Sequence, residues 1–293
     1  MGRKRSQKSN ATAVLFLLVL LVIGGCIAYH EARQAREGPS ATAPQDQSPD
    51  LVSDNRLIYG GAPRPRPGSE AELQFEVLKN EGYIAGYSES RRDPLWVSYR
   101  VFHPATLSHL ERPSSFSTDT RTTARVKDSD FTRSGYDRGH MAPNEAIMEE
   151  YGFQGQMETF LLSNICPQAP ELNRHVWERL EAQERKYAAE CEEIWVIDGP
   201  IFADLNGGTT QRLAAGVAVP SAFYKIIVDE QDRPGGKPRA FAVIMPQDVK
   251  GTELPQQFLT TIAEIEKESH LEFFWKLDAA TRAELESRRG EMW

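Results

Sequence analysis

The 293-residue chain contains few cysteines, and their scarcity excludes two kinds of small domain. Of its three cysteines, Cys26 lies in an apolar segment, and only Cys166 and Cys191 lie in the rest of the chain. Two cysteines are too few for a disulfide framework, and no CxxC spacing indicates a zinc site. They could form one disulfide in an oxidising compartment, or be two small buried hydrophobic residues.

An excess of basic residues is also missing. The formal net charge is −8, and the charged residues before His30 are all basic. From His30 onward, 30 Lys and Arg residues stand against 42 Asp and Glu residues, which gives a net charge of −12. A domain of this charge cannot coat nucleic acid electrostatically, as basic domains do. Any site for a polyanion must therefore be a local basic cleft, or be charged by a metal.

Only one long apolar run occurs in the chain, at residues 11–29, and a basic flank at residues 1–10 precedes it. At about 1.5 Å per residue, a helical run of this length spans roughly a bilayer core. We predict a signal-anchor transmembrane segment whose basic flank stays cytoplasmic and whose following residues lie on the other side of the membrane. A cleaved signal peptide, or a lipid on Cys26 at the end of the sequence IGGC, would export the chain as well.

A polar linker is predicted at residues 30–56. Its centre, residues 37–50, is rich in Pro and Ser and has almost no large apolar residue, so it cannot help to build a core. From Leu57 the pattern becomes globular and continues to the C-terminus without an internal repeat. The sequence therefore predicts one domain at residues 57–293.

Within this domain the sequence predicts both strands and helices. Segments rich in β-branched and aromatic residues predict strands at residues 95–102, 194–198, 222–228 and 240–245. Segments rich in helix-forming residues predict helices at residues 71–80, 172–189 and 257–270. This mixture favours an α+β fold with helices on a central, largely antiparallel sheet. Trp177 and Trp195 are expected to be buried, and Lys225 to be a solvated strand residue.

The stretch Asp137-Arg138-Gly139-His140 places an acid, a guanidinium, a glycine and an imidazole side by side. Gly139 would let the backbone turn tightly, so that Arg138 and His140 can face one cleft. A neutral imidazole can take a proton from water near neutral pH, and the planar guanidinium matches phosphate oxygens. The pair indicates attack on a phosphodiester, although a lone histidine of this kind is more often a partly buried structural residue.

A second group of polar residues comprises Asn164 and two residues of the predicted helix that starts near Leu172. On that helix Asn173 and Glu181 are eight positions apart, a rotation of about 80° and a rise of about 12 Å. Mg²⁺ keeps most of its waters and often takes only one or two protein oxygens, so a direct Asn173 ligand with Glu181 on bound water would suit it. Judged by spacing alone, Asn173 could equally cap the helix instead of binding a metal. By the same criterion, Glu181 is better explained as an ordinary solvated carboxylate than as part of a metal site.

Three separated blocks resemble the DNA/RNA non-specific endonuclease family: DRGHMAP at 137–143, LLSNICPQ at 161–168 and LNRHVWERLE at 172–181. Further blocks extend this resemblance from about Leu57 over most of the chain, at residues 60–63, 96–100, 111–119 and 196–202. The resemblance implies a ββα-metal (His-Me) finger, in which a helix crosses the strand of the DRGH motif and Mg²⁺, replaceable by Mn²⁺, lies between them.

The resemblance also implies roles for individual residues. His140 corresponds to the general base and Asn173 to the direct protein ligand of the metal. Glu181 corresponds to an acid that binds through metal-bound water, and Asn164 to an amide that supports the site. Two phosphate-binding arginines are implied, at Arg138 and, in a looser block, at Arg112. Asp137 is expected to shape the motif.

The implied activity is cleavage of DNA and RNA with little sequence preference, leaving 5′-phosphate ends, by a chain that is often a homodimer in this family. With the predicted anchor, the catalytic domain would be periplasmic or extracellular, or lie in the mitochondrial intermembrane space. Two alternatives are a tethered phosphodiesterase of small or lipid-derived diesters and a non-catalytic tethered binding protein. Zinc suits the residues less well, because only His175 offers a second imidazole nearby.

Overall fold

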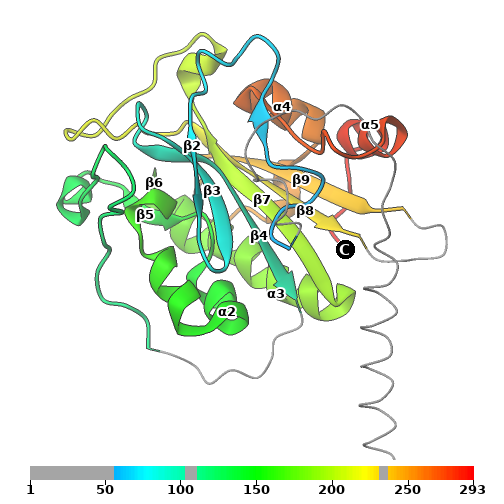
Figure 1. The fold of residues 1–293 in the computed structure, drawn as a ribbon, viewed down its shortest axis with the longest axis horizontal. Helices are drawn as coiled ribbons and strands as arrows, with labels where there is room; N and C mark the ends of the chain where they lie inside the picture. Colours follow the sequence, from blue (N-terminus) through cyan, green and yellow to red (C-terminus); the bar gives the residue numbers. More distant parts are fainter. Residues whose placement is uncertain (1–55, 103–110, 231–236) are drawn as a thin grey trace, which may run out of the picture. The chain divides into compact units, whose positions relative to one another are not determined.

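A seven-stranded antiparallel sheet forms the centre of the computed structural model, which describes residues 56–102, 111–230 and 237–293 (Figure 1). The strand order is β10-β9-β8-β7-β4-β3-β2, and each neighbouring pair is antiparallel. The strands are β2 (Glu76–Lys79), β3 (Tyr83–Ser88), β4 (Asp93–Phe102), β7 (Glu193–Ile201), β8 (Ala222–Asp229), β9 (Arg239–Pro246) and β10 (Leu259–Thr260).

Helices cover both faces of this sheet (Figure 1). The first face packs against α2 (Asn144–Thr159), the π-helix η3 (Leu172–Trp177) and α3 (Glu178–Cys191). The second face packs against α4 (Ile262–Ser269) and α5 (Ala279–Ser287). In β8, Phe223 and Ile227 point to the first face and Tyr224 and Ile226 to the second, as the period of two in a strand requires. This arrangement confirms the predicted α+β fold with a central antiparallel sheet.

Two smaller sheets lie beside the central one. In one, β1 (Arg64–Pro65) pairs with β11 (Leu271–Glu272). In the other, β5 (Asp137–His140) pairs with β6 (Ile165–Gln168), and η3 and α3 follow β6 directly. The 3-10 helices η1, η2, η4 and η5 connect these elements, at Asp128–Phe131, Leu162–Asn164, Ala203–Asn206 and Pro255–Phe258. Strands β5 and β6 with the following helix give the strand, strand, helix order of the expected finger.

The predicted elements differ in outcome. The four predicted strands are confirmed as parts of β4, β7, β8 and β9, and the helix predicted at 172–189 corresponds to η3 and α3. The helix predicted at 257–270 is shorter, because it begins only at Ile262. The helix predicted at 71–80 is wrong: this segment ends in β2. Leu73, Phe75 and Val77 alternate toward the second core face, and this period of two outweighs the helix-forming residues between them.

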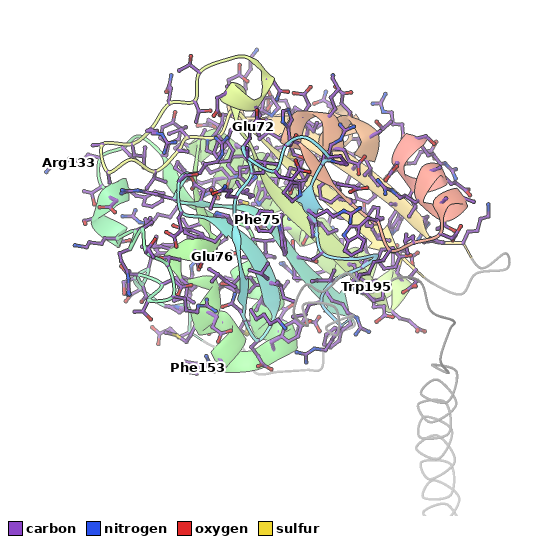
Figure 2. All side chains as sticks on the ribbon, turned by 45° about the horizontal axis from the view of Figure 1, so that its top comes forward. Glu72, Phe75, Glu76, Arg133, Phe153 and Trp195 are labelled. Atoms are coloured by element: carbon purple, nitrogen blue, oxygen red, sulfur yellow. The ribbon has the colours of Figure 1, made fainter. Side chains whose placement is uncertain are left out.

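Several single residues can also be placed. Trp177 and Trp195 are buried, as predicted, and Phe153 projects outward from α2 (Figure 2). Cys166 and Cys191 are both buried and neither forms a disulfide, which matches the expectation of two small hydrophobic residues. Lys225 is fully buried, so the expectation of a solvated lysine is wrong.

The basic flank, the anchor and almost all of the linker lie outside the described residues, which begin at Arg56. In the part of the chain that the structure describes, no helix is both long and apolar enough to cross a membrane.

Candidate active site

The DRGH residues form β5, which ends at the rim of a cleft. Side chains two positions apart lie on the same side of a strand, so Arg138 and His140 point one way and Asp137 the other. Gly139 pairs with Cys166 within the sheet rather than forming a turn. A Cβ atom at Gly139 would lie 2.3 Å from Gln168 Oε1, so close packing explains this glycine, and the predicted tight turn is wrong.

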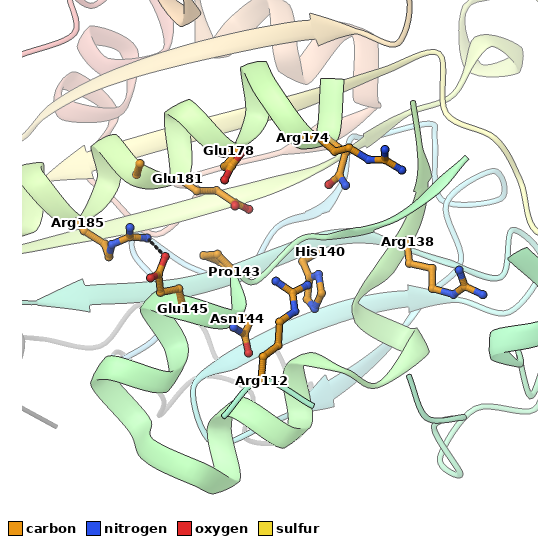
Figure 3. Close-up of a pocket in the computed structure, with 12 residues that line it drawn as sticks. Arg112, Arg138, His140, Pro143, Asn144, Glu145, Arg174, Glu178, Glu181 and Arg185 are labelled. Atoms are coloured by element: carbon orange, nitrogen blue, oxygen red, sulfur yellow. Dashed lines mark ion pairs between the residues drawn. The ribbon is translucent and has the colours of Figure 1, made fainter. Parts of the chain in front are cut away.

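The cleft has a volume of about 380 Å³ and lies between β5, the start of α2 and the helix formed by η3 and α3 (Figure 3). Its lining is mostly charged and comprises Arg112, Arg138, His140, Pro143, Asn144, Glu145, Asn173, Arg174, Glu178, Glu181, Ala182 and Arg185. Five of the six predicted site residues therefore meet here. The sixth, Asn164, does not line the cleft.

His140 is held in an apolar setting. Its side chain is 8% exposed, and its ring packs against Phe116 and Phe160 at centroid distances of 5.3 and 5.0 Å. Burial, together with the positive charge of Arg112, lowers the pKa of His140 to about 3. The imidazole is therefore neutral at pH 7. Its Nε2 atom has no hydrogen-bond partner among the described residues, so it can accept a proton in the tautomer that carries its hydrogen on Nδ1.

Asn164 supports the strand that carries His140. Its Oδ1 accepts from the Ala142 amide at 2.9 Å, and its Nδ2 donates to the carbonyls of Ala142 and Thr159, both at 3.0 Å. Its own carbonyl accepts from the Met141 amide at 3.0 Å. Because these backbone groups occupy its amide, Asn164 fixes the chain just after His140 and has no free donor for a substrate.

Asn173 is oriented by Asp137 of the DRGH motif. Its Nδ2 donates to Asp137 Oδ2 at 3.0 Å, and Arg174 donates to both oxygens of the same carboxylate at 2.7 and 2.6 Å. Burial raises the pKa of Asp137, but the hydrogen bonds from Arg174 and Asn173 outweigh it and leave the pKa below its usual value. With its nitrogen engaged in this way, Asn173 has Oδ1 as the end that can coordinate a cation.

Glu181 extends from α3 toward the same cleft, as does Glu178 (Figure 3). Burial raises the pKa of Glu181 to about 8, while the charge of Lys225 opposes this shift. A carboxyl group in such a setting needs a nearby cation to stay ionised at pH 7. The hard oxygens of Asn173 and Glu181 therefore fit Mg²⁺ that keeps most of its waters. Among the described residues no cluster of three or more His, Cys, Asp and Glu side chains has the arrangement of metal ligands, so a closed zinc site is not found there.

The two predicted arginines differ in their surroundings. Arg112 is exposed, lies 5.4 Å above the Phe160 ring, and has no acidic partner in the described parts of the chain. Arg138 is paired with Asp128 Oδ1 at 2.6 Å and also donates to the Asp128 carbonyl. Arg112 is therefore the freer of the two for a phosphate.

The other seven residues that line the cleft were not among the predicted site residues, and several of them have polar contacts there. Arg174 holds Asp137, and Arg185 pairs with Glu145 at 3.0 Å. Asn144, the first residue of α2, has a buried Oδ1 without a partner among the described residues. Only Arg174 had a signal in the sequence, because it directly follows the candidate ligand Asn173.

Comparison with known proteins agrees with this geometry. The sequence pattern of the DNA/RNA non-specific endonuclease family matches residues 60–280, which include all of the candidate site. The chain belongs to this family. It is therefore a nuclease, a hydrolase that acts on nucleic acids.

Individual relatives span most of the chain. Nuclease C1 of Cunninghamella echinulata var. echinulata is 32% identical over 241 residues, which cover 75% of this chain and 93% of that protein. A nuclease of Nostoc sp. is 27% identical and covers 79% and 85%. The mitochondrial endonuclease G of Homo sapiens is 30% identical and covers 68% and 69%.

A solved structure has the same fold. The crystal structure of the EndoG/EndoGI complex, described as showing the mechanism of EndoG inhibition, contains a chain 25% identical to this one, with a TM-score of 0.61. The match covers 72% of this chain and 94% of that one. The solved structure thus supports the fold that the DRGH resemblance implied for the present chain.

Proposed function

We propose that this member of the family is a Mg²⁺-dependent endonuclease, which Mn²⁺ also supports, that hydrolyses DNA and RNA with little sequence preference and leaves 5′-phosphate ends. One observation carries the proposal. In one cleft, neutral His140 lies beside the cation Arg112 and opposite the helix of Asn173 and Glu181, and among the described residues neither His140 Nε2 has a hydrogen-bond partner nor Arg112 an acidic one.

Each residue of the cleft has a role that its surroundings allow. Asn173 Oδ1 and the carboxylate of Glu181 would hold the metal and its waters, and when bound the metal supplies positive charge where the phosphate and leaving oxygen become more negative. His140 Nε2 takes the proton from the attacking water. Arg112 binds the nonbridging phosphate oxygens through charge-assisted hydrogen bonds.

A cleft that binds the phosphate of the substrate rather than its bases should have little sequence preference. The cleft offers arginines, carboxylates and an imidazole, which are suited to a phosphate and a hydrated cation, whereas sequence is read by contacts to base edges. The ribose and deoxyribose backbones carry the same phosphodiester. We therefore expect supercoiled plasmid and single-stranded RNA to be cut at similar rates.

A substrate panel tests the proposal. Full-length protein is incubated with plasmid DNA, with RNA and with bis-p-nitrophenyl phosphate, each with Mg²⁺ or with excess EDTA. We expect cleavage of both nucleic acids only with metal, at least 100-fold faster than the small diester, and products that a ligase can rejoin because they carry 5′-phosphates. Faster turnover of the small diester would instead favour a phosphodiesterase, and full activity in EDTA would contradict the metal requirement.

We also propose that residues 11–29 anchor the chain in a membrane, with the nuclease domain on the extracytoplasmic side. The apolar run and its basic flank support this orientation. Two similar proteins of Homo sapiens are named as mitochondrial, and in a mitochondrion the side that we propose is the intermembrane space. Protease added outside intact cells or inner-membrane-enclosed vesicles should digest the domain. Recovery of the chain in the soluble fraction after lysis would contradict an anchor.

A further inference from the structure

Lys225 lies in the middle of β8, and its side chain has no exposed surface. Its Nζ atom is 2.6 Å from Glu184 Oε1 and 3.1 Å from Asp198 Oδ2. Nζ also donates to the hydroxyl of Tyr99 at 3.0 Å, and this hydroxyl donates to Glu184 Oε2 at 2.8 Å. We name this group the buried lysine cluster: Lys225, Glu184, Asp198 and Tyr99. Removing an ammonium group from water is costly, so it requires several such acceptors around it.

The buried lysine cluster joins the middle of the sheet to α3. Lys225 and Asp198 are directly opposite each other on β8 and β7, and Tyr99 comes from β4. Glu184 is the member that α3 contributes. Apolar side chains would let a helix slide on a sheet, whereas hydrogen bonds between charged groups are directional. The cluster therefore fixes where α3 lies along the strands.

The same helix carries both residues that would hold the metal. Glu181 lies three residues before Glu184, and so on a neighbouring part of the helix surface. Trp177 is four residues after Asn173 and four before Glu181, and its ring centre is 4.4 Å from Lys225 Nζ. Lys225 therefore contacts the helix at two points, one on each side of Glu181.

Trp177 also marks a change in helix geometry. The π-helix η3 ends at Trp177, and the regular helix α3 begins at Glu178. A π-helix has more residues per turn than an α-helix, so the position of the change sets the angle between Asn173 before it and Glu181 after it. The attraction between a cation and an indole face holds the ring at this point.

We infer that Lys225 is a positioning residue: it fixes the change from π-helix to α-helix and thereby aims Asn173 and Glu181 at one metal ion. This inference rests on the proposed metal dependence. A purely structural cluster would stabilise the fold without setting the affinity for metal. The two roles therefore differ in a binding measurement made without nucleic acid.

The experiment measures binding of Mn²⁺ to the full-length protein by electron paramagnetic resonance. We expect Lys225→Met, which keeps the length of the side chain, to bind Mn²⁺ at least tenfold more weakly than wild type. This loss is of the size found when groups that orient metal ligands are removed, roughly 10-fold to 100-fold. Circular dichroism checks that the variant is folded.

A matched control is Arg239→Met. Arg239 on β9 pairs with the buried Asp229 of β8 at 2.8 Å, and it does not line the cleft. This variant also breaks a partly buried ion pair of the sheet, so it should melt at a lower temperature while binding Mn²⁺ as wild type does. Equal weakening in both variants would show a general loss of stability and overturn the inference.

If Lys225→Met does not fold, a second variant tests whether Lys225 positions the metal ligands. Lys225→Met/Glu184→Gln removes the cation together with one buried carboxylate, so fewer buried charges lack a partner. We expect this variant to fold and still to bind Mn²⁺ at least tenfold more weakly. Wild-type affinity in either folded variant overturns the inference alone, whereas a wild-type protein that binds no Mn²⁺ overturns the proposed metal dependence as well.

Discussion

At the scale of the residue, the surroundings of His140 keep it neutral. Its ring packs against those of Phe116 and Phe160, with Arg112 nearby. Neutrality is what a general base needs, and the surroundings that maintain it also disfavour the protonated form in the folded state. The titration of His140 should therefore be visible in the stability of the protein.

Stability should fall below pH 6.5 because of His140. Its pKa falls from 6.5 to about 3 on folding, so its contribution is complete above pH 6.5 and is lost as the pH falls toward 3, where the unfolded chain alone binds the proton. Between pH 7 and pH 5 the metal-free wild type should lose about 2 kcal/mol more unfolding free energy than His140→Gln, at about 1.4 kcal/mol per unit. Urea unfolding at both pH values measures this difference, and equal losses would contradict the neutral buried state.

Asp137 should matter through Asn173 rather than through contact with substrate. In Asp137→Ala the Asn173 amide loses the acceptor that fixes its orientation, and we expect roughly 10-fold to 100-fold weaker binding of Mg²⁺. Calorimetric titration with Mg²⁺ measures the change. Asp137→Asn keeps an acceptor oxygen and serves as the control, with a smaller loss. Unchanged affinity in Asp137→Ala would mean that the Asp137 contact does not orient a ligand.

At the scale of the element, the cleft depends on close packing within the sheet of β5 and β6. An alanine side chain at Gly139 would place its Cβ 2.3 Å from Gln168 Oε1 and 2.6 Å from Gln168 Cβ. We expect Gly139→Ala to cost about 1–3 kcal/mol of unfolding free energy, as overpacking does. Gly139→Ala/Gln168→Gly removes the opposing side chain and should recover part of this loss. Urea unfolding measures the loss in Gly139→Ala, in Gln168→Gly and in the double variant. A loss in the double variant equal to the sum of the two single losses would contradict the contact.

The sequence predicted well those elements whose local residue pattern matches the burial that they have in the fold. Strands β4, β7, β8 and β9 have runs of β-branched and aromatic residues because both of their faces are buried. Helix α2 was not predicted, because Gly152 interrupts it with non-helical backbone angles and its residues form no clear apolar stripe. The segment 71–80 was misassigned because its helix-forming composition concealed an alternating pattern.

The candidate site could be predicted where its residues belong to short motifs, and not where they meet only in three dimensions. The blocks around His140, Asn164 and Asn173 were visible in the sequence. The contact of Asp137 with Arg174 joins residues 37 positions apart, and that of Lys225 with Glu184 joins residues 41 apart. No local pattern reports such contacts, so a buried lysine was expected to be solvated.

At the scale of the whole molecule, charge should govern how tightly nucleic acid is held. The acidic residues that outnumber the basic ones from His30 onward repel a polyanion, and Arg112 in the cleft, which has no acidic partner among the described residues, is a local exception. Binding should therefore be weak, directed to the backbone and strongly dependent on salt.

Salt dependence tests this view of binding. Two unrelated duplexes should bind with similar affinity at 50 mM salt, and both affinities should fall steeply toward 200 mM. Arg112→Ala should lower the slope of log K against log salt by about 1, because one phosphate contact is lost. Tight binding of one duplex at high salt, measured by fluorescence anisotropy, would contradict it.

The central claim is that His140 is the general base of a metal-dependent nuclease, and a single-turnover rate tests it most directly. Cleavage of plasmid DNA with Mg²⁺ is compared for wild type, His140→Ala and the control His270→Asn, which replaces a histidine outside the cleft with a residue that tolerates its positive φ. Loss of a general base costs about 10²-fold to 10⁴-fold, so His140→Ala should be slowed by that factor while remaining folded, and His270→Asn should keep the wild-type rate. A folded His140→Ala protein that cuts as fast as wild type would contradict the claim.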